Sequence, residues 1–522
     1  MAIAMPTSNF FMNLWWVLLL ANWLGEGDFG AKLARFRSSY LLHAVLVLFG
    51  MHLVGMLWSE DLAYGFNDIR KKLPLLAVPV VLLTSERLSR FRWTHLQVIY
   101  VFTVVIVSII GLIRHLVIPD LPYRDIIPWI SHIRFSLNVV FVICILLYRF
   151  RDADACFSHY VEGFNRTRAF LGKAPLQSVS LSRRFSAVYR AADMLMVLFL
   201  LFFLLLQQSY TGVVVLGAIV IVAAFWSRSL KAVLSVVAAI MLVGGVVGYH
   251  VYDYYHLRSL SVGPLQECTA NGNPYVHEQN GFIECGGYVH NYLCYEELYR
   301  EWPKHSSMSL DSVSEVGFAI DKALIRYLNC LNLPKDSLGV CQLSPADVAL
   351  IEKGVGNPHY AQQGSLNKFF DQLLFEFENA RHNGDIRGFT MLERFELWAN
   401  GWQCILQQPW FGVGTGDLVN VEHARLAEID SSIADTSKHI HNQYLTLILA
   451  FGFVGFAVIV FFFARALVCG GRASLLNVAF VVLVLVSFVN EDTLETLAGV
   501  MLVVFWGSLL YVERVRKNHN LK

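Results

Sequence analysis

Apolar runs of about the length of a membrane-crossing helix recur along most of this chain, separated by short polar segments. They lie near 9–24, 38–58, 73–84, 96–117, 134–148, 193–208, 209–226, 232–252, 443–468, 473–489 and 496–512. A helix needs about 20 apolar residues to cross a bilayer. Such segments must be helical, because backbone amides in lipid have no water to bind. The run at 73–84 is short, as expected of a tilted or interfacial helix. The pattern predicts an all-α polytopic membrane protein with about 11–12 transmembrane helices.

One long hydrophilic stretch interrupts this pattern. It divides the chain into N-terminal transmembrane helices at 1–254, a loop domain at 255–440 and C-terminal transmembrane helices at 441–522. Residues 259–299 are rich in Gly, Asn, Cys and Tyr, which is typical of irregular loops. Beyond them, the helical spacing of apolar residues predicts a mainly helical domain, with helices over 312–331, 344–353, 365–380 and 390–407. Ser344-Pro345 favours a helix start, and Gln408-Pro409 ends the last helix.

Composition and charge support this division and give it an orientation. The chain has 522 residues, of which 56% are hydrophobic and only 16% charged, against about 25% charged in an average soluble domain. The Lys and Arg clusters between the spans all fall on one side, which the positive-inside bias makes cytoplasmic. The loop domain and the acids Glu491, Asp492 and Glu495 then lie outside. The same counting places the N-terminus outside, and residues 1–10 lack the basic segment of a cleavable signal peptide.

The cysteines add an argument about compartment. Six of the nine fall in the predicted external segment, namely Cys268, Cys285, Cys294, Cys330, Cys341 and Cys404. An even number of cysteines in an oxidising compartment favours disulfides, although the spacing does not fix the pairing. A zinc site is the alternative, but no two of these cysteines have the close spacing of a paired zinc-ligand motif. We therefore expect disulfides.

Arg394 is the first candidate for chemistry in the loop domain. It shares a helical face with Trp398, one turn further on. A surface ion pair with Glu393 or Glu396 is the simple interpretation. A guanidinium also binds phosphate oxygens through two hydrogen bonds, and glycines at 412, 414 and 416 allow close backbone approach to a ligand. Dinucleotide binding is excluded because no βαβ pattern surrounds these glycines, and a tight turn back to the membrane is the interpretation we favour for them.

His441 is the second candidate, because it lies where the loop domain meets an apolar run. His439 and Asn442 flank it. An unperturbed imidazole titrates near pH 6.5, so it can accept a proton at neutral pH. Within the run, Gly452 and Gly455 are one turn apart and would let a neighbouring helix approach closely. The sequence therefore predicts a general base at the membrane surface.

These residues together resemble the O-antigen ligase superfamily. The resemblance rests on Arg394, Trp398, Pro409, Gly412, Gly414, His441-Asn442, Gly452 and Gly455, and on a hydropathy profile with one large late loop. It implies a metal-independent, inverting glycosyltransferase of the bacterial inner membrane with its active site facing the periplasm. Such enzymes move a glycan from an undecaprenyl-diphosphate carrier to a hydroxyl on lipid A–core, a glycan or a protein. The resemblance makes His441 the catalytic base and Arg394 the diphosphate-binding arginine.

One family feature is missing from this chain. A second arginine usually follows a Ser or Thr at the outer mouth of an earlier span, but at Ser209-Tyr210 a tyrosine stands instead. Arg134, at the outer end of another span, and Arg387 are the residues that can replace its charge. The expected substrate-binding residues are therefore Arg134, Arg387, His439, Asn442, Trp398 and Tyr210.

Several activities share this pattern. A ligase is the reading we favour, with an O-antigen polymerase or a protein O-oligosaccharyltransferase as the alternatives in the same superfamily. A membrane transporter or flippase is the alternative from another class, but it should carry ionisable residues in the middle of its spans, which are nearly free of charge here. A purely structural receptor would not depend on His441. We expect membrane lipids as surroundings, no cofactor, no metal and no nucleic-acid partner.

Overall fold

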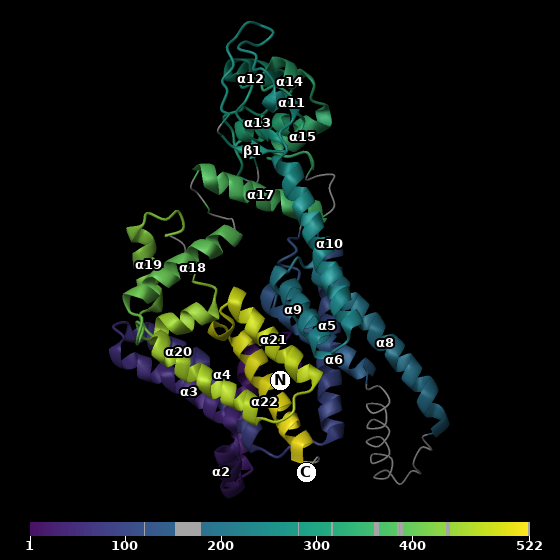
Figure 1. Cartoon of the computed structure of the whole chain (residues 1–522), viewed down its shortest axis with the longest axis vertical. Coiled ribbons are helices and arrows are strands. Elements are labelled where there is room, and N and C mark those ends of the chain that lie inside the picture. Colours follow the sequence, from purple (N-terminus) through teal and green to yellow (C-terminus); the bar gives the residue numbers. More distant parts are fainter. Residues whose placement is uncertain are drawn as a thin grey trace. The chain divides into compact units, whose positions relative to one another are not determined.

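The computed structural model is built almost entirely of helices (Figure 1). It describes residues 1–118, 121–151, 179–279, 281–314, 317–359, 365–383, 386, 390–434 and 439–519. The chain forms two compact units. The first comprises Met1–Val236, Leu397–Ile429 and Thr436–Lys522, and the second comprises Val237–Glu396 and Asp430–Asp435.

Every apolar run of the sequence lies in a helix. The corresponding helices are α1 (Asn9–Gly25), α3 (Tyr40–Gly55), α4 (Leu62–Thr84), α5 (Arg90–Val117), α6 (His132–Arg151), α8 (Val179–Leu206), α9 (Tyr210–Trp226), α10 (Leu230–Tyr255), α20 (Gln443–Cys469), α21 (Leu475–Asn490) and α22 (Leu497–His519). Among the described residues, seven helices are long and apolar enough to cross a membrane, and α9 and α21 are shorter apolar helices. The chain is thus an all-α polytopic membrane protein.

Helix α4 differs most from its predicted span. It has 23 residues instead of the short run at 73–84, and it continues through Pro74 and Pro79. Its N-terminal half carries Asp68, Lys72 and other charged residues. These lower the hydropathy of the first three turns, so the predicted span began only at residue 73. The first unit also contains α2 (Phe29–Ser38), η1 (Met56–Trp58), α19 (Leu418–Glu428) and η3 (Thr493–Glu495).

The core of the first unit joins helices that are distant in sequence. Helix α20 packs along α3, α22 along α4, α21 along α9, and α6 along α8. An aromatic cluster contributed by α5, α6, α21 and α22 lies at the centre. The ring centroids of Tyr100 and Trp506 are 4.8 Å apart and those of Phe141 and Phe480 4.9 Å apart. The Tyr100 hydroxyl donates to Asn138 Oδ1 over 2.7 Å, so this buried polar group is satisfied.

Helix α20 is broken at Gly452, where φ is 64° and ψ is −178°. The break leaves carbonyls before it and amides after it without helical partners. The backbone of the preceding loop supplies them: Val413 N–H and Gly414 N–H donate to Leu449 O and Ala450 O over 2.9 and 3.0 Å. In return, Phe453 N–H donates to Pro409 O over 2.7 Å and Val454 N–H donates to Trp410 O over 3.2 Å. We name this set of backbone bonds the 409–414 clip.

The glycines in and near the clip have different structural roles. Gly412 and Gly414 have φ of 70° and 93°, so they form the tight turn that the spacing predicts. At Gly455, an added β-carbon would lie 2.6 Å from Met51 Cε of α3, so this glycine does permit close helix packing. Gly452 has a different role. It allows the break in α20, because residues with a β-carbon are strained at positive φ and glycine is not.

Substitution of Gly452 by alanine is expected to destabilise the first unit by about 2 kcal/mol or more, since positive φ strains alanine. The new β-carbon would also lie 2.2 Å from the Trp410 carbonyl carbon. Gly217→Ala in α9 is the control, because an added β-carbon there meets nothing within 4 Å. Thermal unfolding of the purified variants should show a lower melting temperature for Gly452→Ala only; equal melting temperatures would contradict the strain argument.

The second unit contains the short elements of the hydrophilic stretch. They are α11 (Ser259–Val262), β1 (Ile283–Glu284), β2 (Gly287–Tyr288), α12 (Tyr295–Glu301), η2 (Trp302–Lys304), α13 (Ile320–Cys330), α14 (Ser337–Cys341), α15 (Pro345–Glu352) and α17 (Ser365–Asn383). Helices α10 and α18 (Thr390–Gln407) cross between the units in sequence. The predicted start of α15 is confirmed by a capping box between Ser344 and Asp347. Helix α13 begins later than predicted, at Ile320, and a bridge between Val313 and Ala319 precedes it.

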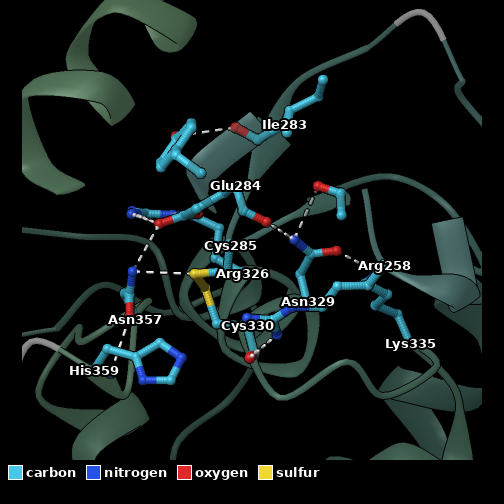
Figure 2. The surroundings of a disulfide bond; sticks show 12 residues. Arg258, Ile283, Glu284, Cys285, Arg326, Asn329, Cys330, Lys335, Asn357 and His359 are labelled. Carbon is cyan, nitrogen blue, oxygen red and sulfur yellow. Dashed lines mark hydrogen bonds and ion pairs between the residues drawn. A yellow bond between two sulfur atoms is a disulfide. The ribbon is translucent and has the colours of Figure 1, made fainter. Parts of the chain in front are cut away.

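One disulfide, between Cys285 and Cys330, ties the β1–β2 turn to the end of α13 (Figure 2). Beside it, the buried Glu284 carboxylate accepts two 2.8 Å hydrogen bonds from the Arg326 guanidinium. The expectation of disulfides is therefore met for one pair. Cys268, Cys294, Cys341 and Cys404 are free thiols.

Candidate functional site

A polar cleft of about 460 Å³ lies within the first unit, where α4, α6, α20 and α22 have their ends. Its lining includes two histidines, one arginine, one lysine and five acids, contributed by residues from Asn9 to Ala498. The acids come from α4, from α19 and from the segment that joins α21 to α22. The cleft therefore combines a possible base, two cations and several carboxylates.

His441 is fixed at the mouth of this cleft by its backbone. Asn442 caps α20, since its side-chain oxygen accepts from Tyr444 N–H and Leu445 N–H over 3.0 and 3.2 Å. His441 precedes this cap with φ of 51°, a conformation that histidine tolerates better than most side chains. Its N–H donates to Asp492 Oδ2 over 2.9 Å. The imidazole is 34% exposed, so a substrate in the cleft can reach it.

Asp492 connects the histidine to α20. Its Oδ2 also lies 3.8 Å from His441 Nδ1, and its Oδ1 accepts the Thr446 hydroxyl over 2.9 Å. Burial raises the pKa of Asp492 to about 6, with Glu495 adding to the effect. A carboxylate at this distance stabilises the imidazolium that forms when the ring takes a proton. Asp492 is therefore placed to support His441 as a base.

Arg134, in the first turn of α6, holds the segment that carries Asp492. Its guanidinium donates to Asp492 O over 3.0 Å and to Thr493 Oγ1 over 3.3 Å. It also lies 3.4 Å from the Glu491 carboxylate. Arg134 is only 6% exposed and lines the cleft. The guanidinium thus contributes charge to the cleft and fixes the position of the acid behind His441.

A second ionic cluster lies at the same ends of the helices. The buried Lys72 ammonium is 2.8 Å from Asp68 and 2.7 Å from Glu495. Glu495 in turn accepts from Gln443 Nε2 over 3.1 Å, and Gln443 Oε1 accepts from Leu494 N–H over 2.7 Å. These contacts link α4, η3 and the first turn of α20. The ammonium thus offsets part of the negative charge of the two carboxylates and gives each of them a hydrogen-bonding partner.

Glu422 of α19 is the buried acid that this helix contributes to the cleft. It is 2% exposed. Burial, followed by repulsion from Asp492, raises the pKa of Glu422 well above its ordinary value of 4.5. The folded protein therefore holds the protonated form of this carboxyl to a higher pH than an unfolded chain would.

This shift predicts a pH dependence of stability. Because the pKa of Glu422 is higher in the folded protein, the folded form binds the proton more tightly. The contribution of Glu422 to stability is then fully present below pH 4.5 and is lost as pH rises from there through the folded-state pKa. Melting temperatures at about pH 5 and about pH 8 should differ less in Glu422→Gln than in the wild type, since glutamine cannot ionise. Glu428→Gln on the exposed side of α19 should behave like the wild type, and an identical pH response in all three would contradict the assignment.

The structure places the other sequence-predicted residues in different surroundings. His439 lines the cleft with His441, and Trp398 packs against the core of the first unit. Tyr210 begins α9, is 44% exposed and is not among the cleft-lining residues. Arg394 is half-buried in the part of α18 that belongs to the second unit. Arg387 lies outside the described residues.

Sequence reasoning missed Lys72, Asp68 and Glu422 as members of the site. A signal did exist for the first two, because charged residues at the start of an apolar run are expensive unless they are paired. The acids Glu491, Asp492 and Glu495 were noticed only as evidence of orientation. No sequence signal distinguished Glu422 from other acids of an amphipathic helix.

Comparisons with known proteins bear on the same part of the chain. A family model described as O-antigen ligase matches residues 363–460. A search of curated proteins found no match. The matched segment contains Arg394, the 409–414 clip, His441-Asn442 and Gly452. This match supports the membership of the chain in the O-antigen ligase superfamily.

Proposed function

We propose that this protein is an O-antigen ligase-like glycosyltransferase. It moves a glycan from an undecaprenyl-diphosphate carrier to a hydroxyl of lipid A–core at the periplasmic face of the bacterial inner membrane. The observation that carries the proposal is the position of His441. Within the segment that matches the family, it lies in a polar cleft at the end of a membrane helix and beside a buried carboxylate.

The proposed reaction is a direct displacement. His441 removes the proton of the acceptor hydroxyl, and the oxygen forms a bond to the anomeric carbon. The bond from that carbon to the diphosphate oxygen breaks, and the carrier diphosphate leaves with the electron pair. The configuration at the anomeric carbon is therefore inverted. A positioned base contributes about 10²- to 10⁴-fold to such a step, and Asp492 stabilises the imidazolium.

Positive charge is needed where the diphosphate leaves. Two cations, Lys71 and Arg134, line the cleft together with five acids. The Glu491 carboxylate lies beside Arg134, and the buried Lys72 pairs with Asp68 and Glu495. This pairing limits the cationic excess available to a diphosphate. We therefore propose that Arg394 supplies the main diphosphate contact, with Arg134 or Arg387 in the role of the second arginine. Arginines provide this charge without losing their own protons, so the mechanism requires no metal.

A polymerase and a protein-directed transferase would use the same donor chemistry and differ in the acceptor. A transporter is less well supported by α20. Broken helices in transporters expose backbone carbonyls that coordinate ions. In α20, however, the carbonyls of Leu449 and Ala450 accept hydrogen bonds from Val413 and Gly414. The break therefore serves the attachment of a loop.

Deletion of the gene, followed by gel analysis of surface glycans, tests the proposal. Loss of long chains from lipid A–core, with polymer still attached to the carrier, supports the ligase. Single repeat units on lipid A–core indicate the polymerase. Normal lipopolysaccharide with unglycosylated proteins indicates the protein-directed transferase, and unchanged glycans throughout would refute all three.

Complementation of the deletion strain then tests the arginines. Arg394→Ala and Arg134→Ala are each expected to reduce transfer by about tenfold or more, because a charge-assisted contact to the diphosphate is lost. Arg425→Ala is the control, since Arg425 pairs with the exposed Glu428 and is not among the residues that line the cleft. Protein levels in the membrane fraction separate loss of activity from loss of folding. Wild-type transfer by both test variants would remove the diphosphate assignment.

A further inference from the structure

Three side chains of different chemistry converge in the second unit, away from the residues assigned to transfer. Glu301 is the last residue of α12, His305 follows η2, and Cys341 ends α14. Glu301 Oε1 lies 3.4 Å from Cys341 Sγ and 3.4 Å from His305 Nε2. All three potential ligand atoms are within 4.8 Å of one another. One carboxylate, one imidazole and one thiol thus face a common point.

The donor set and its spacing fit a zinc ion. Zinc binds thiolate sulfur at about 2.3 Å and imidazole nitrogen or carboxylate oxygen at about 2.0–2.2 Å, usually in a tetrahedron. Such bonds place neighbouring ligand atoms about 3.3–3.6 Å apart. The two separations of 3.4 Å agree with this geometry. The first is a hydrogen bond from the Cys341 thiol to Glu301 Oε1, which a bound ion would replace. A mixed sulfur, nitrogen and oxygen set also favours zinc over magnesium or calcium, which prefer oxygen alone.

The surroundings hold the three groups in place without a metal. Glu297 of α12 accepts hydrogen bonds from the backbone N–H and the hydroxyl of Ser337, which begins α14. These bonds join the two helices that carry Glu301 and Cys341. Lys304 Nζ lies 2.7 Å from Glu301 Oε2, the oxygen that does not face Cys341. An outer contact of this kind orients a ligating carboxylate and leaves its other oxygen for the metal.

The three groups are accessible to an ion from solvent and can balance its charge. Cys341 is exposed and His305 is partly exposed, so an ion can enter from solvent and a water can occupy the fourth position. The Cys341 thiol would lose its proton to solvent as the sulfur–zinc bond forms. One thiolate and one carboxylate then balance the two charges of the ion.

We propose that Glu301, His305 and Cys341 form a zinc-binding site with three protein ligands and one open position. The site joins α12 and η2 to α14. Only one of its ligands is a cysteine, so the spacing of cysteines along the chain could not reveal it. The inference does not depend on the proposed glycosyl transfer.

Metal binding by the purified full-length protein in detergent tests the proposal. After treatment with a chelator, the protein is incubated with zinc chloride, desalted and analysed for bound metal. The wild type should retain one zinc ion per chain. His305→Gln and Cys341→Ser should lose it, and Cys268→Ser should keep it because Cys268 is another exposed free cysteine that is not part of the cluster.

Thiol labelling gives a second readout on the unmodified protein. Zinc should slow alkylation of Cys341 by about tenfold or more, because a metal-bound thiolate is no longer a free nucleophile. Alkylation of Cys268, measured in the same sample by mass spectrometry, should not change. The proposal is overturned if the wild type retains no zinc, if the variants retain as much as the wild type, or if zinc leaves the labelling of Cys341 unaltered.

Discussion

Replacement of His441 by asparagine abolishes glycan transfer and leaves the protein folded: this is the result we expect from the cleft. Asparagine tolerates the left-handed backbone at this position, where φ is 51°. It keeps the N–H that donates to Asp492, but its amide cannot accept a proton at neutral pH. The expected loss is about 10²- to 10⁴-fold, the usual contribution of a general base. Alanine at this position would confuse the result, since backbone strain would be added to the loss of the ring.

The measurement is transfer by purified protein from a carrier-linked glycan to an acceptor, followed on gels. Thermal unfolding of the same samples reports folding. His290→Asn is the matched control, because His290 lies in the second unit, has a 41% exposed side chain and pairs with Glu278. Retention of about a tenth or more of the wild-type rate by His441→Asn would be too much for a variant without its base, and would show that another group removes the proton.

The largest effect on stability is expected at Lys72. Replacement by methionine keeps the apolar length of the side chain but removes the ammonium that pairs with Asp68 and Glu495. Two carboxylates would then remain beside one another with no cation between them. Loss of one partner from a buried ion pair costs about 3–5 kcal/mol. We therefore expect Lys72→Met to unfold at a much lower temperature than the wild type, or to fail to accumulate in the membrane.

Two further variants show whether charge is the cause. Lys71→Met changes the neighbouring lysine, which is exposed, and should have little effect. Combining Lys72→Met with Asp68→Asn and Glu495→Gln removes the uncompensated charges and should recover most of the lost stability. A triple variant as unstable as Lys72→Met would mean that packing around the side chain, and not its charge, is responsible.

The membrane helices could be predicted from the sequence because lipid imposes a local rule. Each spanning segment has to satisfy its own backbone and present apolar side chains, so hydropathy alone locates it. The rule failed for the first half of α4, where Asp68 and Lys72 neutralise each other across one helical turn. It also could not foresee the break in α20, because the partners of its freed backbone groups come from a loop about forty residues earlier.

Only the part of the candidate site that is local in sequence could be predicted. His441 and Asn442 are visible in the sequence because they lie next to each other at the mouth of a span. Asp492, which binds the His441 N–H, is 51 residues away, and Lys72 and Glu495 come from opposite ends of the chain. Contacts over such separations depend on how helices pack. Hydropathy and periodicity describe single helices and hold no information about contacts between helices.

The 409–414 clip has a consequence for how this part of the chain can change. Its bonds join main-chain atoms only, so they do not depend on which side chains the loop carries. Trp410 and Phe411 are both largely exposed and can be exchanged for other residues without weakening the attachment. Gly452 has no such freedom, because any β-carbon there meets the backbone of Trp410. Related chains that share this architecture should therefore vary widely at 410 and 411 while keeping glycine at 452.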